Sequence, residues 1–358
     1  MTATAEQRRA RILEVVRERG SIRVVELAER VGSAQVTVRR DVAALAESGL
    51  LHRSHGVVSP VRGGSPLTPA TGRDRTIGML VPTGGPYFDE VIDGALAAVT
   101  SAGARLLLGV TSYESADDRP QVEQLLDAGL DGILLTPNWR PGDASDDATW
   151  IRELPVPALL VERIAPPDSA VAQLDSVGSD HAHGVLLALR HLLALGHESV
   201  LLVAREDTWT AHQVRAGYTE GVRLLGMEPR PVIDVQRPGQ ESRRVAAAVA
   251  NAVAHDGVRA VLVHNDQEAL QLTPMLRAHG LRTPDDLALI SYDDVFAALA
   301  APPLTAVAPP RRAVGAAAVE LMLRRLAAGP DLPVHHVRLL PELKIRTSCG
   351  GRGSDKTG

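Results

Sequence analysis

Residues 77–94 read IGMLVPTGGPYFDEVIDG and set the pattern for most of this 358-residue chain. A continuous apolar run over 77–82 precedes a Gly-Pro turn and then a stretch of helical period over 88–101. Similar apolar runs recur at 105–110, 132–136, 158–161, 200–204, 232–235, 260–264 and 287–291. Stretches of helical period separate most of them, at 119–128, 183–195, 214–225, 242–254 and 268–279. Apolar strands that alternate with helices predict an α/β fold with parallel sheets covered on both faces.

The α/β pattern extends over residues 76–347, which is long for one sheet and favours two lobes. Open parallel sheets bind ligands at the carboxyl ends of their strands, so we expect a ligand site there. Residues 60–75, PVRGGSPLTPATGRDR, have no apolar period and are rich in Pro, Gly, Ser and Thr, which predicts a linker. A first domain over 1–59 and a disordered tail over 348–358 complete the expected organisation.

The first domain is expected to contain three helices and a hairpin. Helical patterns cover 6–19, 24–31 and 35–47, and glycines follow each of them. Short strands at 50–54 and 56–59 predict the hairpin. Two helices joined by a tight glycine-containing turn are typical of a helix-turn-helix, and the hairpin would be its wing.

Charge is divided unevenly between the two parts of the chain. The whole chain has a net charge of −5. Residues 1–60 contain ten Arg, no Lys and seven acidic residues, a net of +3, which leaves −8 for the rest. A basic first domain on an acidic body indicates that only the first domain meets a polyanion.

The second helix of a helix-turn-helix enters the major groove of DNA by its N-terminal end. Gln pairs with adenine and Arg with guanine, while hydroxyl side chains suit phosphate or base contacts. The residues expected to face DNA are Ser33, Gln35, Thr37, Arg39 and Arg40 on this helix, and Arg53 and His55 on the wing. Asp41 is expected to support the helix or to pair with a neighbouring Arg. A helical interaction module with a solvated arginine-rich face is the alternative that the residues alone leave open.

The stretch RRARILEVVRERGSIRVVELAERVGSAQVTVRRDVAALAESGLLHRSHG, residues 8–56, resembles the DeoR-type winged helix. The spaced IL, the EL-A pair, the TVRRD block and the R-HG end occur in order. The resemblance implies DNA binding. After the His-Gly, Val57 and Val58 replace the usual glycine and alanine, so the wing tip departs from the family pattern.

The body resembles the LacI/GalR regulators and the periplasmic sugar-binding proteins that share their effector fold. Phrases in family order include DGILLTP at 131–137, HLLALGHESVLLV at 191–203, HNDQEAL at 264–270, LALISYDD at 287–294 and PPLTAVAPP at 302–310. The resemblance implies a periplasmic-binding-protein-like domain of two lobes with an effector in the cleft between them. It also implies three chain crossings between the lobes, expected near 176–180, 293–296 and 307–310.

The effector residues follow from this resemblance position by position, except Trp209, which is singled out because the chain has only 3% aromatic residues. They are Tyr87, Phe88, Glu162, Arg163, Trp209, Arg215, Asp266 and Asp293. Carboxylates and Arg bind hydroxyls, and aromatic faces cover the apolar side of a sugar. Other roles remain open: Arg215 could pair with Asp266 or Asp293 without touching a ligand, Tyr87 and Phe88 could pack against the core, and Trp209 could lie on the surface.

These features predict a ligand-responsive transcription repressor of a sugar-utilisation operon, which binds double-stranded DNA as a homodimer. The alternatives are an enzyme acting on a sugar or sugar phosphate, and a solute-binding transport protein. No phosphate-binding loop, nucleophile elbow or metal-ligand cluster occurs in the sequence, so no catalytic residue, metal or cofactor is expected. The usual coupling helix between the two domains is also missing, because the linker is rich in Pro and Gly.

Three features of the sequence bear on where in the cell the protein is found. Residues 1–11 are polar and lack the apolar core of a signal peptide. No run approaches the roughly 18 apolar residues that a membrane-spanning helix needs. The single cysteine, Cys349, cannot form an internal disulfide, which fits a reducing compartment. We therefore expect a cytoplasmic protein with no membrane partner.

Overall fold

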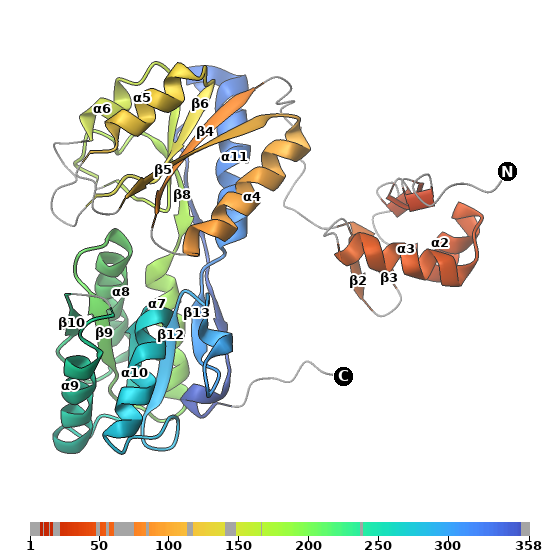
Figure 1. Cartoon of the computed structure of the whole chain (residues 1–358). Helices are drawn as coiled ribbons and strands as arrows, with labels where there is room; N and C mark the ends of the chain where they lie inside the picture. Colours follow the sequence, from red (N-terminus) through yellow and green to blue (C-terminus); the bar gives the residue numbers. More distant parts are fainter. Residues whose placement is uncertain are drawn as a thin grey trace. The chain divides into compact units, whose positions relative to one another are not determined.

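The computed structural model describes residues 8–9, 11–13, 15–16, 22–47, 51–54, 57–60, 75–83, 86–112, 117–139, 148–165, 167–236 and 239–351. The chain divides into two compact units, Met1–Pro69 and Ala70–Gly358 (Figure 1). Residues 61–74 of the predicted linker lie outside the described residues, as does the wing residue His55.

The first unit contains the predicted helix-turn-helix and wing. Its elements are β1 (Ile22–Arg23), α2 (Val24–Val31), α3 (Gln35–Glu47), β2 (Leu51–Ser54) and β3 (Val57–Pro60). The three strands form an antiparallel sheet in the order β1-β3-β2, in which β1 was not predicted. The turn between α2 and α3 needs Gly32, whose φ of 65° is left-handed and strained for other residues. Buried aliphatic side chains hold α2 and α3 together, among them Ile12, Val16, Leu27, Val38 and Val42.

The second unit has two lobes, each built on a six-stranded sheet. The strands of the N lobe are all parallel, in the order β14-β8-β7-β6-β4-β5. They are β4 (Thr76–Thr83), β5 (Arg105–Ser112), β6 (Gly132–Leu135), β7 (Ala158–Val161), β8 (Asp175–Ser179) and β14 (His336–Leu339). Helices α4 (Tyr87–Ala102) and α11 (Arg311–Ala328) cover one face, and α5 (Arg119–Asp127) and α6 (Thr149–Arg152) cover the other (Figure 1).

The sheet of the C lobe has the order β10-β9-β11-β12-β13-β15, and only β15 is antiparallel to its neighbour. Its strands are β9 (Leu201–Arg205), β10 (Ile233–Val235), β11 (Ala260–His264), β12 (Ala288–Tyr292), β13 (Thr305–Ala308) and β15 (Glu342–Lys344). Helices α7 (His181–Ala194) and α8 (Trp209–Leu225) pack on one face, and α9 (Ser242–His255) and α10 (Asp266–Ala278) on the other. The prediction of two α/β lobes with parallel sheets is confirmed.

The chain crosses between the lobes three times, but one crossing was placed wrongly. It crosses from β8 to α7 and from β13 to α11, close to the expected positions, and from β14 to β15 between residues 339 and 342. Residues 293–296 do not cross. They form a turn inside the C lobe, because β12 pairs in parallel with β13 and both strands belong to one sheet.

The apolar pattern did not predict strand β8, and the predicted start of the C-terminal tail was wrong; buried polar residues are involved in both. Strand β8, DSVGS, is completely buried although it is not apolar, because Arg325 binds the Asp175 carboxylate at 2.8 and 3.0 Å. The tail does not begin at residue 348. Ser348 is buried and its hydroxyl donates to the Leu289 carbonyl at 2.6 Å, and Cys349 is also buried, so both belong to the C lobe. In the described part of the chain, no helix combines the length and the apolar character needed to cross a membrane.

Candidate functional site

Helix α3 carries four of the residues expected to face DNA, Gln35, Thr37, Arg39 and Arg40, and Ser33 lies in the turn before it. The helix buries Val38 and Val42 in the core of the unit, so its opposite side points outward. Gln35, Arg39 and Arg40 are exposed, while Ser33 and Thr37 are half-buried. Arg53 lies on β2, where it pairs in register with Val58, but its side chain is outside the described set.

Val36 is a residue on the same side of α3 that the sequence did not single out. Its side chain is 79% exposed, although a valine gains nothing from contact with water. An apolar side chain in the first turn of a recognition helix suits the methyl group of thymine. The sequence contained a signal for this residue, because Val36 is apolar and yet does not share the helix face of Val38 and Val42.

Asp41 closes the buried side of α3, and the expectation that it pairs with a neighbouring Arg is confirmed. Its carboxylate accepts hydrogen bonds from Nε of Arg8 at 2.6 Å and from Nε of Arg9 at 3.1 Å. Burial alone would raise the pKa of Asp41, but the hydrogen bonds and positive charges of Arg8 and Arg9 outweigh it and lower the pKa. Arg39 and Arg40 make no such pairs among the described residues and remain available.

Asp41→Asn is expected to destabilise the first unit by about 2 kcal/mol, because one buried partner of a charged network is lost. A lowered pKa means that the carboxylate stabilises the fold above the unfolded-state pKa and loses this effect as the pH falls through the folded-state pKa. Hydrogen exchange of peptides from residues 22–47 in the full chain at pH 7 measures the effect, as opening that is about 30-fold more frequent. Glu26→Gln is the control, since it breaks only an exposed pair with Arg30. Equal exchange in both variants would contradict the assigned role of Asp41.

A cavity lies in the second unit at the carboxyl ends of strands from both lobes, where a ligand site was expected. Its volume is about 130 Å³. Of the eight predicted effector residues, seven line it, namely Tyr87, Phe88, Glu162, Arg163, Trp209, Asp266 and Asp293. The sequence did not single out other lining residues, which include Arg205, Thr208, His264, Asn265, Glu268 and Phe296.

Glu162 follows β7, and groups of the protein itself already bind its carboxylate. Oε1 accepts from Ser179 Oγ at 2.8 Å and from the Tyr87 hydroxyl at 3.1 Å, and Oε2 accepts from Ser179 N at 3.0 Å. Burial opposes its ionisation, but the proximity of His181 and the bonds from Ser179 prevail and lower the pKa of Glu162. Glu162 therefore orients the Tyr87 ring rather than presenting two free acceptor oxygens.

The arginines of the cavity are also engaged by the protein. Arg163 donates from Nε to the Pro137 carbonyl at 2.7 Å and from Nη1 to the Glu162 carbonyl at 2.9 Å. Arg205 forms two bonds of 2.8 Å to the carboxylate of Asp207. Both residues line the cavity, but Arg205 is ion-paired with Asp207 and the guanidinium of Arg163 is held by carbonyl oxygens.

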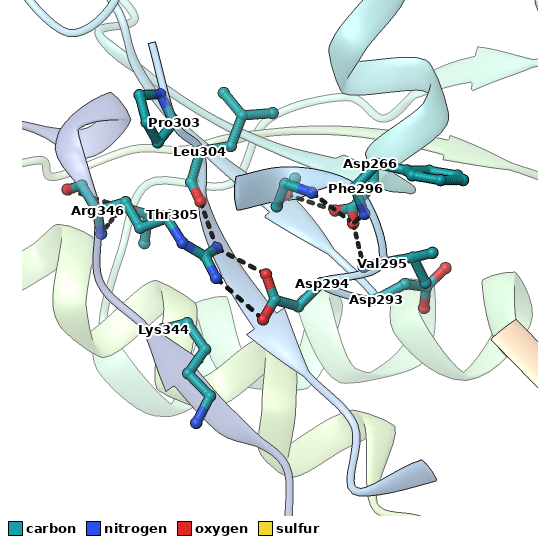
Figure 2. Close-up of polar contacts among 12 residues, drawn as sticks. Asp266, Asp293, Asp294, Val295, Phe296, Pro303, Leu304, Thr305, Lys344 and Arg346 are labelled. Atoms are coloured by element: carbon teal, nitrogen blue, oxygen red, sulfur yellow. Dashed lines mark hydrogen bonds and ion pairs between the residues drawn. The ribbon is translucent and has the colours of Figure 1, made fainter. Parts of the chain in front are cut away.

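Asp266 begins α10 and holds a turn of the C lobe rather than an open binding site (Figure 2). Its Oδ2 accepts backbone N–H groups of three consecutive residues, Val295 at 2.6 Å, Phe296 at 2.9 Å and Ala297 at 3.2 Å. Its Oδ1 accepts the Ser291 hydroxyl at 2.6 Å. Burial is the main cause that raises the pKa of Asp266. Asp266 lies at the cavity as predicted, but its Oδ2 accepts hydrogen bonds from the backbone of the 295–297 turn.

Three polar atoms of the cavity residues are buried and have no hydrogen-bond partner among the described residues. They are Oδ1 of Asp293, Nδ1 of His264 and Nε1 of Trp209. Burial, and next the negative charge of Asp266, raise the pKa of Asp293 to about 7. Burial, and next the charge of His181, lower the pKa of His264 to about 3, so this ring is neutral. Buried polar atoms without partners are rare, and in a cavity they mark positions where a ligand or a water molecule can bind.

Arg215 is the one predicted effector residue that does not line the cavity. Its guanidinium donates to the carbonyls of Arg205 at 2.7 Å and Ala204 at 2.6 Å, and to the Asp234 carboxylate at 2.7 Å. It pairs with neither Asp266 nor Asp293, so the alternative ion pair is not observed either. Arg215 instead fixes the end of β9, from which the side chain of Arg205 reaches the cavity.

Aromatic rings form the apolar wall of the cavity. Tyr87 and Phe88 meet edge to face with ring centres 5.3 Å apart. Trp209 packs against Trp139 at 6.0 Å and is buried, so it is not the surface residue that the sequence left possible. Nowhere in the described ranges do three His, Cys, Asp or Glu side chains gather as they would around a metal ion.

Comparisons with known proteins match both units. A model of the DeoR-like helix-turn-helix domain matches residues 8–61, and a model of the periplasmic binding protein-like domain matches residues 189–349. The HTH-type transcriptional regulator PtxS of Pseudomonas plecoglossicida is 29% identical over 348 residues, which cover 92% of this chain and 96% of PtxS. The HTH-type transcriptional repressor CytR of Escherichia coli K12 is 26% identical over 255 residues, 70% of this chain and 73% of CytR.

A solved structure shares the fold of the second unit. It is a LacI family transcriptional regulator from Enterococcus faecium with bound ribose, similar with a TM-score of 0.59 and 23% identity. The match covers 76% of this chain and 98% of that one.

Proposed function

We propose that this DNA-binding transcription regulator, which joins a DeoR-like helix-turn-helix domain to a periplasmic binding protein-like domain, is a repressor whose effector is a neutral sugar. The observation that carries the proposal is the set of unpartnered polar atoms on Asp293, His264 and Trp209, all in one cavity with an aromatic wall. The relatives are named as transcriptional regulators and repressors, and the Enterococcus protein was solved with ribose.

The unpartnered atoms match the chemistry of a polyol. A sugar hydroxyl donates one hydrogen bond and accepts others. The Asp293 oxygen accepts such a bond, the Trp209 N–H donates one, and the neutral ring of His264 does either, according to its tautomer. The rings of Tyr87 and Phe296 supply the apolar contact.

The charges of the cavity favour a neutral ligand over an anion. One oxygen of Asp293 has no partner among the described residues, and the ionised form of this carboxyl repels phosphate or carboxylate groups. Arg163 and Arg205, which would attract an anion, are already engaged with oxygens of the protein. A sugar phosphate therefore gains less from this cavity than the corresponding free sugar.

For the first unit, we propose that α3 reads the operator through Gln35, Val36, Arg39 and Arg40, with Ser33 and Thr37 at the edge of the contact. A homodimer would place two such helices on the half-sites of a pseudo-palindrome. Repression of a sugar-utilisation operon takes place in the cytoplasm, where the DNA is.

The runner-up function is an enzyme acting on a sugar, and one observation favours it. A buried carboxyl with a pKa of about 7, as in Asp293, resembles a general acid or base. Sugar hydrolysis uses two carboxyl groups, however, and the other carboxylates that line the cavity, those of Glu162, Asp266 and Glu268, all accept hydrogen bonds from groups of the protein. We therefore place the chain among regulators rather than enzymes.

A thermal-shift panel on the full chain tests the effector proposal. D-ribose, D-xylose, D-glucose and the phosphate esters of ribose and glucose are each added at about 10 mM, since a ligand that binds only the native state raises the melting temperature. We expect a rise with one free sugar and none with its phosphate. A rise with phosphate esters alone, or none with any neutral sugar, would refute the proposal. Consumption of the bound sugar, followed by NMR, would instead support the enzyme.

A further inference from the structure

Arg311 is the first residue of α11, directly after the chain crosses from β13 into the N lobe, and it is 6% exposed. Its contacts in the N lobe are with α4. Nη2 lies 3.1 Å from Oε1 of Glu90, Nε lies 3.3 Å from Oε2, and the guanidinium lies over the Tyr87 ring at 5.6 Å. These bonds attach the guanidinium to the helix that begins at the cavity.

The same guanidinium is bonded to the C lobe. Nη1 donates to the carbonyl of Asp293, and Nη2 lies 3.5 Å from the carbonyl of Asp294. One buried side chain is therefore bound in both lobes. The carbonyl that it binds belongs to the residue whose carboxylate faces the cavity with an unpartnered oxygen.

The turn that carries these carbonyls is itself held firmly in the C lobe (Figure 2). Arg346 binds the Asp294 carboxylate through Nη1 at 2.6 Å and Nη2 at 3.1 Å, and it also donates to the Leu304 carbonyl at 2.7 Å. Asp266 holds the next three backbone amides, and Asp293 N donates to the Val307 carbonyl at 2.9 Å. If Arg311 shifts, the 293–297 turn can shift with it only when the strands to which the turn is bonded move as well.

The N-lobe end of the link is equally rigid, because α4 and α11 touch through their backbones. A Cβ on Gly94 would lie 1.9 Å from the Arg312 carbonyl oxygen, and a Cβ on Gly315 would lie 1.9 Å from the Val91 carbonyl oxygen. Only glycine allows this approach. A displacement of Arg311 therefore moves both helices together.

We propose that Arg311 is the positioning residue that fixes the angle between the two lobes, and through it the shape of the effector cavity. A link between two rigid bodies sets their relative orientation, and it is bonded here to the backbone of Asp293. That Asp293 binds an effector rests on the proposed function. The angle between the lobes can be measured without any effector, so the proposed role of Arg311 and the proposed sugar effector can be refuted independently.

The test measures the distance between the lobes in the full, effector-free chain by double electron–electron resonance. Spin labels are placed at Leu96→Cys on α4 and Leu224→Cys on α8, two exposed positions in different lobes, while the native Cys349 is buried. A second pair at Leu195→Cys and Leu224→Cys lies within the C lobe and reports whether that lobe stays folded.

Arg311→Gln is compared with a change at its neighbour, Arg312→Gln, since within the described ranges Arg312 forms its ion pair with the exposed Asp93 of its own lobe, at 2.9 Å. We expect Arg311→Gln to broaden the interlobe distance distribution about twofold and Arg312→Gln to leave it as in the wild type. Glu90→Gln, which alters only an exposed side chain at the N-lobe end, should broaden it less. The distribution within the C lobe should stay unchanged in all three.

An unchanged interlobe distribution in Arg311→Gln, or equal broadening in Arg312→Gln, would overturn the proposal. If Arg311→Gln also broadens the distribution within the C lobe, the residue serves folding, and the result of Glu90→Gln then decides. Wild-type behaviour of Glu90→Gln in that case would overturn the proposal as well.

Discussion

Asp293→Asn is expected to weaken sugar binding about a hundredfold, because the cavity loses a charged acceptor whose Oδ1 has no hydrogen-bond partner among the described residues. A hydrogen bond from a hydroxyl to a carboxylate contributes about 1.5–3 kcal/mol, and the amide nitrogen of Asn cannot accept one. Isothermal titration calorimetry with the sugar that stabilises the wild type measures the loss. Asp89→Asn is the matched control, since Asp89 is exposed on the first turn of α4 and does not line the cavity.

If Asp293 accepts a hydrogen bond from the sugar, the affinity should change with pH in a predictable direction. The pKa of Asp293 is about 7, and the ionised form is the better acceptor, so wild-type affinity should rise as the pH passes through 7 and then level off. The affinity of Asp293→Asn should not change over this range. Wild-type binding that weakens as the pH rises would contradict the role of Asp293.

The stability of the same variant shows whether lost affinity is merely lost folding. A carboxyl whose pKa is raised by folding destabilises the native state as pH rises between its unfolded pKa, 3.8, and its folded pKa. From pH 5.5 to pH 8 the wild type should lose about 2 kcal/mol relative to Asp293→Asn. Urea unfolding followed by tryptophan fluorescence reports on the second unit, which contains all three tryptophans. A variant that binds less and yet is more stable at pH 8 has lost a ligand contact.

The contrast between Asp266 and Asp293 shows where sequence reasoning ends. Both are acidic residues that follow buried strands, and the same resemblance points to both. Whether an oxygen is open to a ligand depends on which donors come close to it. The amides that occupy Asp266 come from residues 295–297, and their approach depends on how the turn after β12 folds against the start of α10. The sequence predicts the residue types of the cavity, but not which of them are already bound.

Predictions based on apolar periodicity agreed with the structure, and most of those that failed concern polar residues in buried places. Runs such as 77–82 and 260–264 became central strands because a strand covered on both faces must be apolar. Strand β8 lacks this signal, since the ion pair of Asp175 with Arg325 takes the place of an apolar side chain. Arg325 is 150 residues away in the sequence, so local pattern cannot reveal the partner.

His264 illustrates a residue that the pattern contained but did not mark. It precedes Asp266 within the phrase HNDQEAL, at the end of a fully buried strand. A histidine there is usually a core residue whose nitrogens are satisfied. The structure distinguishes it, because Nδ1 has no partner in the part of the chain that is described and the ring packs at 5.6 Å from Tyr292.

Arg39→Ala and Arg40→Ala together are expected to reduce operator affinity by at least about a hundredfold. Each exposed arginine at the groove is worth roughly 1–3 kcal/mol. The second unit cannot compensate, because residues 70–358 carry a net charge of −9 and repel DNA. Fluorescence anisotropy of the full chain with an operator selected from random DNA measures the loss. Arg30→Ala is the control, since Arg30 lies on α2 and pairs with Glu26.

The single variants separate the two ways in which these arginines act. An arginine that binds phosphate releases a counterion, so its removal lowers the slope of log K against log salt by about 1 and weakens all DNA sequences alike. An arginine that reads guanine leaves unrelated DNA unaffected and relaxes specificity at one base pair. Because both side chains are exposed and without partners among the described residues, each must show one of these signatures. A double variant that binds the operator as the wild type does would remove α3 from the DNA interface.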